Sequence, residues 1–118
     1  MIKESKLDSG CCAVPGSALD RKPRPIEGPA ADEELAGLAK AIGHPARVRI
    51  LRILSQKEAK VCSQIVGELP LAQSTVSEHL RILRQAGLIR SREEDGPRAG
   101  YCINYETLRR LKALVAII

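Results

Sequence analysis

The four cysteines are the residues of this chain with the most distinctive chemistry. Cys11 and Cys12 are adjacent, whereas Cys62 and Cys102 occur singly. The N-terminus lacks an apolar signal core, and no stretch approaches the roughly 18 uncharged apolar residues of a membrane span. We therefore expect a cytoplasmic protein with no membrane partner. Thiols in that compartment are kept reduced, which points to metal, metalloid or redox chemistry before disulfides.

A second distinctive stretch, residues 72–87, has the pattern of a helix that contacts DNA. Val76, Leu80 and Leu83 recur at i, i+4 and i+7 and form one apolar stripe, and Gly87 suits the end of a helix. The opposite side carries short hydrogen-bonding groups and one cation: Gln73, Ser74, Thr75, Ser77, His79 and Arg81. Short amides and hydroxyls in the first two turns suit base edges and phosphates. An ordinary solvated helix is the alternative interpretation, and His79 is alternatively a structural hydrogen-bonding residue.

The length of the chain indicates one modest domain, and its net charge favours a polyanionic partner. It has 118 residues, no Phe or Trp, and a net charge of +5 from 19 Lys and Arg against 14 Asp and Glu. The core must therefore come from aliphatic residues, and the basic balance favours a nucleic acid. Two histidines and no nucleophile–base pair leave little for catalysis, so we expect no enzyme and no organic cofactor.

The remaining elements are predicted around this helix. Residues 1–31, rich in Pro and Gly, are predicted to be a flexible arm that carries Cys11–Cys12, and residues 32–118 form the folded domain. Asp32 is the expected N-cap of a helix over 32–42, and His44-Pro45 begins a second helix that ends near Gln56. Arg47, Arg49 and Arg52 are placed on its more solvated side.

Helices over 62–69 and 72–86, separated by a tight turn, have the layout of a helix-turn-helix. Ala72 occupies the N-cap position of the second helix and offers no side-chain acceptor. Strands near 88–92 and 100–103 then form a hairpin wing, whose Arg90, Arg92 and Arg98 can approach phosphates or a minor groove. These arginines serve equally well as solubilising charges.

Asn104 is the expected cap of a terminal helix over 105–118. Its apolar side needs cover, which a second copy supplies together with the 32–42 helix, or else the chain's own core does. The predicted fold is mainly α with a small β-hairpin: a homodimeric winged helix-turn-helix in the order α-α-α-α-β-β-α.

This order closely resembles the ArsR/SmtB family of metal- and metalloid-sensing repressors. The resemblance covers about residues 33–115 and rests on the strings AKAIGHPARVRILRIL, VCSQIVGEL, AQSTVSEHLRILRQAGLI and GYCI. It implies a dimeric repressor whose recognition helix reads the major groove of double-stranded operator DNA and whose inducer weakens that binding. The DNA-facing set it implies is Gln73, Ser74, Thr75, Ser77 and His79, with Arg81 near the backbone.

The resemblance also suggests an inducer. VCSQIVGEL is similar to the segment with which arsenic-responsive members bind trivalent arsenic, although only Cys62 is retained here. Some members pair an N-terminal vicinal cysteine pair with one further cysteine, so Cys11, Cys12 and Cys62 are the implied ligands of As(III) or Sb(III). Trivalent arsenic and antimony accept three thiolates, and a helix N-terminus and Lys60 favour the Cys62 thiolate. Binding would then release the repressor of an arsenic-resistance operon from its operator.

Several alternatives to this inducer remain open. The terminal helix has no histidine, which argues against the zinc site of other members. Cd(II) or Pb(II) would need a fourth ligand, and methylated trivalent arsenic would need only two sulfurs. A thiol redox switch would join Cys12 to Cys62, and a winged helix can also bind protein in place of DNA. Cys62 alone is alternatively a buried small residue, and Cys102 is expected to be a bystander.

Overall fold

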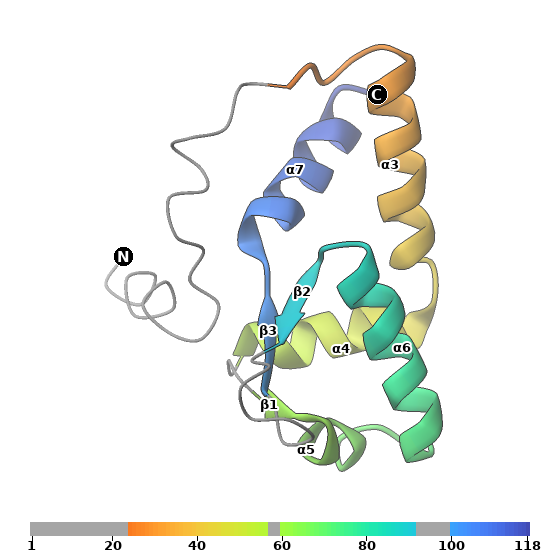
Figure 1. The fold of residues 1–118 in the computed structure, drawn as a ribbon, viewed down its shortest axis with the longest axis vertical. Helices are drawn as coiled ribbons and strands as arrows, with labels where there is room; N and C mark the ends of the chain where they lie inside the picture. The colour runs from red at the N-terminus through yellow and green to blue at the C-terminus, as the bar shows by residue number, and fades with distance from the viewer. Residues whose placement is uncertain (1–23, 57–59, 92–99) are drawn as a thin grey trace, which may run out of the picture.

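The computed structural model describes residues 24–56, 60–91 and 100–118, with residues 60–63 described by their backbone only. Its helices gather at two ends (Figure 1). Helices α3 (Pro29–Ala41) and α7 (Tyr105–Ala116) lie side by side at one end. At the other end α4 (Pro45–Gln56), α5 (Cys62–Val66) and α6 (Gln73–Gln85) surround a small sheet.

Helix α3 begins at Pro29, so the prediction that it starts at Asp32 is wrong. Gly28 is the N-cap with φ 107°, and its carbonyl accepts the Asp32 N–H at 2.9 Å. Pro29 suits the first helical position because its φ is already fixed and its missing N–H would have no partner there. Asp32 instead lies in the first turn, where its carboxylate favours the positive end of the helix.

Arg110 of α7 joins the start of α3 to the segment before it. Its Nε donates to Glu34 Oε2 at 3.0 Å, and its Nη2 donates to Glu34 Oε1 at 2.9 Å. Its Nη1 also donates to the Arg24 carbonyl, and its Nη2 to the Pro25 carbonyl. This hydrogen bonding lowers the pKa of the Glu34 carboxyl. Residues 24–31, predicted to lie in the arm, are therefore tied to α7.

Helices α5 and α6 form the predicted helix-turn-helix. Ala72 is the N-cap of α6 and makes no side-chain cap bond, as predicted, and Gly87 after the helix has φ 84°. Helix α5 ends at Val66, earlier than the predicted residue 69. Gly67 is a poor helix former and Pro70 follows closely, so the chain continues as turns in which Leu69 N–H donates to the Val66 carbonyl.

The predicted hairpin is present, and a third strand joins it. Strands β2 (Ile89–Ser91) and β3 (Gly100–Ile103) pair antiparallel, with Arg90 opposite Cys102. Strand β1 (Lys60–Val61) pairs with the other edge of β3, giving the order β1-β3-β2. Sequence reasoning placed residues 57–60 in a polar link, because a two-residue strand is too short to show an alternating pattern.

The core is aliphatic, as the composition predicts. Its most enclosed side chains are Ile50, Ile65, Val76, Leu80, Leu83, Leu88, Ile89 and Leu114. They come from α4, α5, α6, β2 and α7 and from Leu88 just before β2, so one core joins both ends of the molecule. In the part of the chain that the structure describes, no helix is long and apolar enough to cross a membrane.

We predict that Leu83→Ala lowers the free energy of unfolding by about 2–5 kcal/mol, because it removes a fully enclosed side chain and leaves a cavity. Thermal or denaturant unfolding measures the change. Gln85→Ala, at an exposed position two residues later, is the control and should change stability by less than about 0.5 kcal/mol. Equal effects of the two substitutions would contradict the described packing of α6.

Candidate nucleic-acid interface

Helix α6 presents one polar side to solvent. Val76, Leu80 and Leu83 are buried against the core, as their spacing predicts. The exposed side chains run from the first turn to the last: Gln73, Ser74, Thr75, Ser77, Glu78, Arg81, Arg84 and Gln85. Hydroxyls and an amide occupy the first turns and cations the later ones. This sequence of groups can bond base edges near the helix start and phosphates further along.

Arg81 is not an unpaired cation. Its Nε donates to Glu78 Oε1 at 3.0 Å, and its Nη2 bonds the other carboxylate oxygen. The hydrogen bond from Arg81 lowers the pKa of Glu78 and raises that of Arg81. Both side chains are about half exposed, so the pair adds little to stability. Glu78 therefore orients Arg81, and a phosphate would have to compete with this carboxylate.

His79 differs from the DNA-facing prediction. Its side chain is only 7% exposed, and Nδ1 accepts a hydrogen bond from Arg47 Nε at 3.2 Å. Its ring lies 4.5 Å from the ring of His44, centroid to centroid. Burial is the main cause that lowers the pKa of His79, and His44 and Arg47 add to it. His79 follows Val76 by three positions, so it falls on the buried side of α6, in the alternative structural role.

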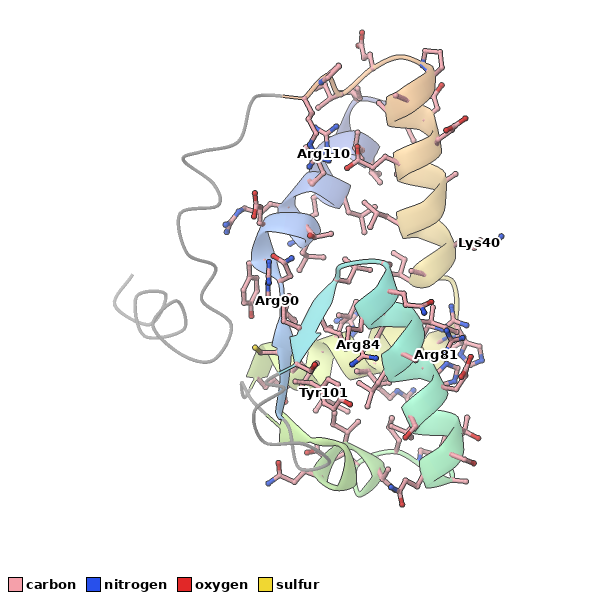
Figure 2. The ribbon with its side chains drawn as sticks, in the orientation of Figure 1. Lys40, Arg81, Arg84, Arg90, Tyr101 and Arg110 are labelled. Carbon is pink, nitrogen blue, oxygen red and sulfur yellow. The ribbon has the colours of Figure 1, made fainter. Side chains whose placement is uncertain are left out.

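Two arginines flank a surface cavity between the end of α6 and the sheet. Arg84, Arg90, Ser91 and Asn104 line this cavity of about 310 Å³, together with Gly87 and Ile89. Figure 2 labels Arg84 on α6 and Arg90 near β2. Arg90 Nε is buried and has no hydrogen-bond partner among the residues that the structure describes. The two guanidinium groups can attract an anionic phosphate to this position beside the recognition helix.

The other predicted site residues fall largely outside the described residues. Arg92 and Arg98 of the wing lie there, as do Cys11 and Cys12. Cys62 is described by its backbone, which begins α5 directly after β1. Among the described side chains no group of three or more His, Cys, Asp or Glu could hold a metal ion. That result does not involve the predicted thiolate ligands.

Cys102, which we expect to be a bystander of the thiolate site, lies on β3. Its side chain is 3% exposed and is disulfide-bonded.

Sequence reasoning missed three residues of this region. Arg84 follows Arg81 by three residues and lies on the same exposed side of α6. Glu78 precedes Arg81 by three residues, which is the spacing of a helical ion pair, so both residues could have been found from spacing. Arg47 was placed on the solvated side of its helix with Arg49 and Arg52. Its contacts are with residues distant in the sequence or with main-chain carbonyls, and no local pattern indicates them.

Comparison with known proteins identifies this arrangement. A family profile described as "Bacterial regulatory protein, arsR family" matches residues 44–91. The transcriptional repressor PagR of Bacillus anthracis is 39% identical over 72 residues, which are 61% of this chain and 71% of PagR. The chain belongs to the ArsR family. It is therefore a DNA-binding transcriptional repressor of the winged-helix type.

Solved structures of ArsR-family proteins agree with this fold. The homodimeric winged helix-turn-helix domain Mb0332 of Mycobacterium bovis is 32% identical and superimposes with a TM-score of 0.61, covering 75% of this chain and 80% of that one. A "possible transcriptional regulator for arsenical resistance" is 28% identical with a TM-score of 0.61, covering 69% and 81%. The chain spans about half the length, 48 to 51%, of three other curated relatives that it matches.

We predict that Gln73→Ala weakens binding to a selected duplex about tenfold or more, because a side-chain amide can bond a base edge at two points. The duplex is selected by the protein from a random-sequence pool, and affinity is measured by fluorescence anisotropy.

Arg84→Ala should weaken binding to all sequences alike and reduce the slope of log affinity against log salt by about one contact. Lys112→Ala, exposed on α7, is the control. Binding unchanged by both α6 substitutions would exclude α6 as the DNA-contacting helix.

Proposed function

We propose that this ArsR-family repressor binds operator DNA as a homodimer and releases it when As(III) or Sb(III) is captured by three cysteine thiolates. The exposed polar side of α6 is the observation that carries the DNA-binding part. Gln73, Ser74, Thr75 and Ser77 face base edges there, and Arg81 and Arg84 reach the backbone. Arg92 and Arg98 extend the contact from the wing.

The dimer is supported by apolar residues that the single chain leaves uncovered. Val115 is 50% exposed and Ile118 91%, and Ile117 and Ile26 are also exposed. They lie on α7, at its end and just before α3, where the two helices pack together (Figure 1). An apolar surface of this kind is covered by a second copy in a two-fold arrangement. Mb0332, with the same fold, is homodimeric.

The thiolate site is proposed from the chemistry of its residues. As(III) prefers three soft sulfur ligands, which Cys11, Cys12 and Cys62 can supply. Cys62 begins α5, and α5 packs against α6. Capture of Cys62 by the ion would therefore act directly on the helix that supports the recognition helix. The similarity to a regulator described for arsenical resistance adds to this proposal.

Release requires a difference in affinity between two shapes of the protein. As(III) lowers DNA affinity only if it binds the free shape more tightly than the DNA-bound shape. We infer that a closed three-thiolate site holds the start of α5 in a position that moves α6 away from its DNA-bound orientation. Linkage is reciprocal, so operator DNA should weaken As(III) binding by the same factor.

We predict that arsenite and antimonite release the reduced protein from its selected duplex, lowering DNA affinity about tenfold or more, within the range of allosteric coupling. Cys11→Ser, Cys12→Ser or Cys62→Ser should each abolish the response while DNA binding without arsenite is retained. Cys102→Ser is the matched control and should keep the response. Full release of Cys62→Ser by arsenite would exclude this site. Release by Cd(II) or Pb(II) alone would point to a four-ligand site, and a response to methylated trivalent arsenic alone to a two-sulfur site.

A thiol redox switch is the second candidate, and the disulfide at Cys102 favours it. In this case two thiols lose two protons and two electrons to an oxidant such as hydrogen peroxide, which is reduced to water, and a disulfide forms. Peroxide would then release the duplex from the wild type but not from Cys102→Ser. Arsenite release that persists in Cys102→Ser, with no effect of peroxide, would leave only the metalloid sensor.

We predict that Val115→Glu converts the dimer to a monomer and weakens operator binding at least about tenfold, because it places a charge in an apolar contact and separates the two recognition helices. Sedimentation velocity measures the mass. Lys112→Glu, exposed on the same helix, controls for the added charge. A Val115→Glu protein that remains dimeric would place the interface elsewhere.

A further inference from the structure

Arg47 of α4 is bonded to two other helices at once. Its Nη1 donates to the Lys40 carbonyl at 3.2 Å and to the Ala41 carbonyl at 3.1 Å, at the end of α3. Its Nε donates to Nδ1 of His79, in the second turn of α6, at 3.2 Å. Figure 2 shows Lys40, near the end of α3, and Arg81 of α6 on the same side of the molecule.

The contact suits each partner electrostatically. The last carbonyls of a helix lack intrahelical partners and carry the negative end of its dipole, so a guanidinium is favoured there. Three hydrogen bonds from one planar group fix its orientation more strongly than a flexible ammonium could. His79 must be neutral at Nδ1 to accept the bond from Arg47, and its buried position on α6 leaves it little room to move.

We propose that Arg47 and His79 are positioning residues that fix the recognition helix α6 relative to the end of α3. This inference rests on the proposed homodimer that reads DNA through α6. Helix α3 packs on α7 beside the proposed dimer surface, so its end is fixed relative to the two-fold axis. The orientation of α6 against α3 then sets the distance between the two recognition helices, and that distance must match the spacing of the half-sites.

The contact should also respond to acid. The charged and titratable groups that act on His79 are His44 before α4, Arg47 on α4 and Glu78 on α6. His44 cannot replace the acceptor, because its own Nδ1 accepts the Ala46 N–H at 3.0 Å. The pKa of His79 lies below the ordinary histidine value, so the neutral form and the contact persist near pH 7. As the pH falls from about 6.5 through this lowered pKa, the proton on Nδ1 removes the acceptor and repels Arg47.

The test measures affinity for the selected duplex and for duplexes with one base pair added or removed between the half-sites. Arg47→Lys keeps the charge but cannot make the three bonds, and it should lose about tenfold in affinity for the selected duplex and most of its preference for that spacing. Arg49→Lys, exposed on the same helix, should match the wild type. A loss of stability alone would not alter the spacing preference, and thermal denaturation confirms that each variant is folded.

His79 supplies a second, independent measurement. Asn keeps an acceptor near the position of Nδ1 and does not titrate, whereas Leu keeps the bulk and removes the acceptor. His79→Asn should bind like the wild type at about pH 7.5 and keep that affinity as the pH is lowered, whereas the wild type should lose about tenfold once His79 is protonated. His79→Leu should resemble Arg47→Lys at about pH 7.5.

Two results separate failure of this inference from failure of the proposed function. If the wild type binds selectively while folded Arg47→Lys and His79→Leu keep its affinity and spacing preference within about twofold, the positioning role is overturned and the repressor stands. If the wild type selects no duplex at all, the proposed function fails and the positioning role fails with it.

Discussion

Burial of one side of α6 is the constraint on which the rest of the structure depends. Val76, Leu80 and Leu83 are almost completely enclosed, and they fix the rotation of the helix about its own axis. Because a helix turns once every 3.6 residues, this choice alone determines that Gln73, Ser77, Arg81 and Arg84 face outwards. The side proposed to contact DNA is thus a consequence of how the other side packs.

A rigid recognition helix is useful only if it is held at a defined place in the proposed dimer. Two kinds of contact do this. Aliphatic packing joins α6 to α4, α5 and β2, and it tolerates small shifts because it has no direction. Hydrogen bonds from Arg47 add direction, since each requires a particular distance and angle. At the other end Arg110 ties α7 to Glu34 and to the chain before α3.

Much of this fold could be predicted from the sequence, because the spacing of apolar residues and the capping residues indicate where its helices lie. Local patterns predict the 72–86 helix, with Ala72 as an N-cap that makes no side-chain bond and Gly87 after its end. They also predict Asn104 as the cap of the terminal helix, and the structure confirms these features. The errors at His79, Arg47 and strand β1 share a physical cause, which is a partner distant in the sequence. His79 and Arg47 bond each other across 32 positions, and a polar residue on a helix gives no local sign of such a partner. Strand β1 exists only because β3 offers it an edge. The start of α3 was misplaced because Asp32 is a good cap and Pro29 an equally good first residue.

The most direct test of this account is nuclear magnetic resonance mapping of the reduced dimer as it is titrated with its selected duplex. The account predicts that the largest amide shift changes fall on the exposed side of α6, from Gln73 to Arg84, with smaller ones around Arg90. The apolar surface at Val115 should change little, because the second copy of the proposed dimer covers it. Shift changes centred on α3 and α7, with α6 unaffected, would contradict the claim that this repressor reads DNA through α6.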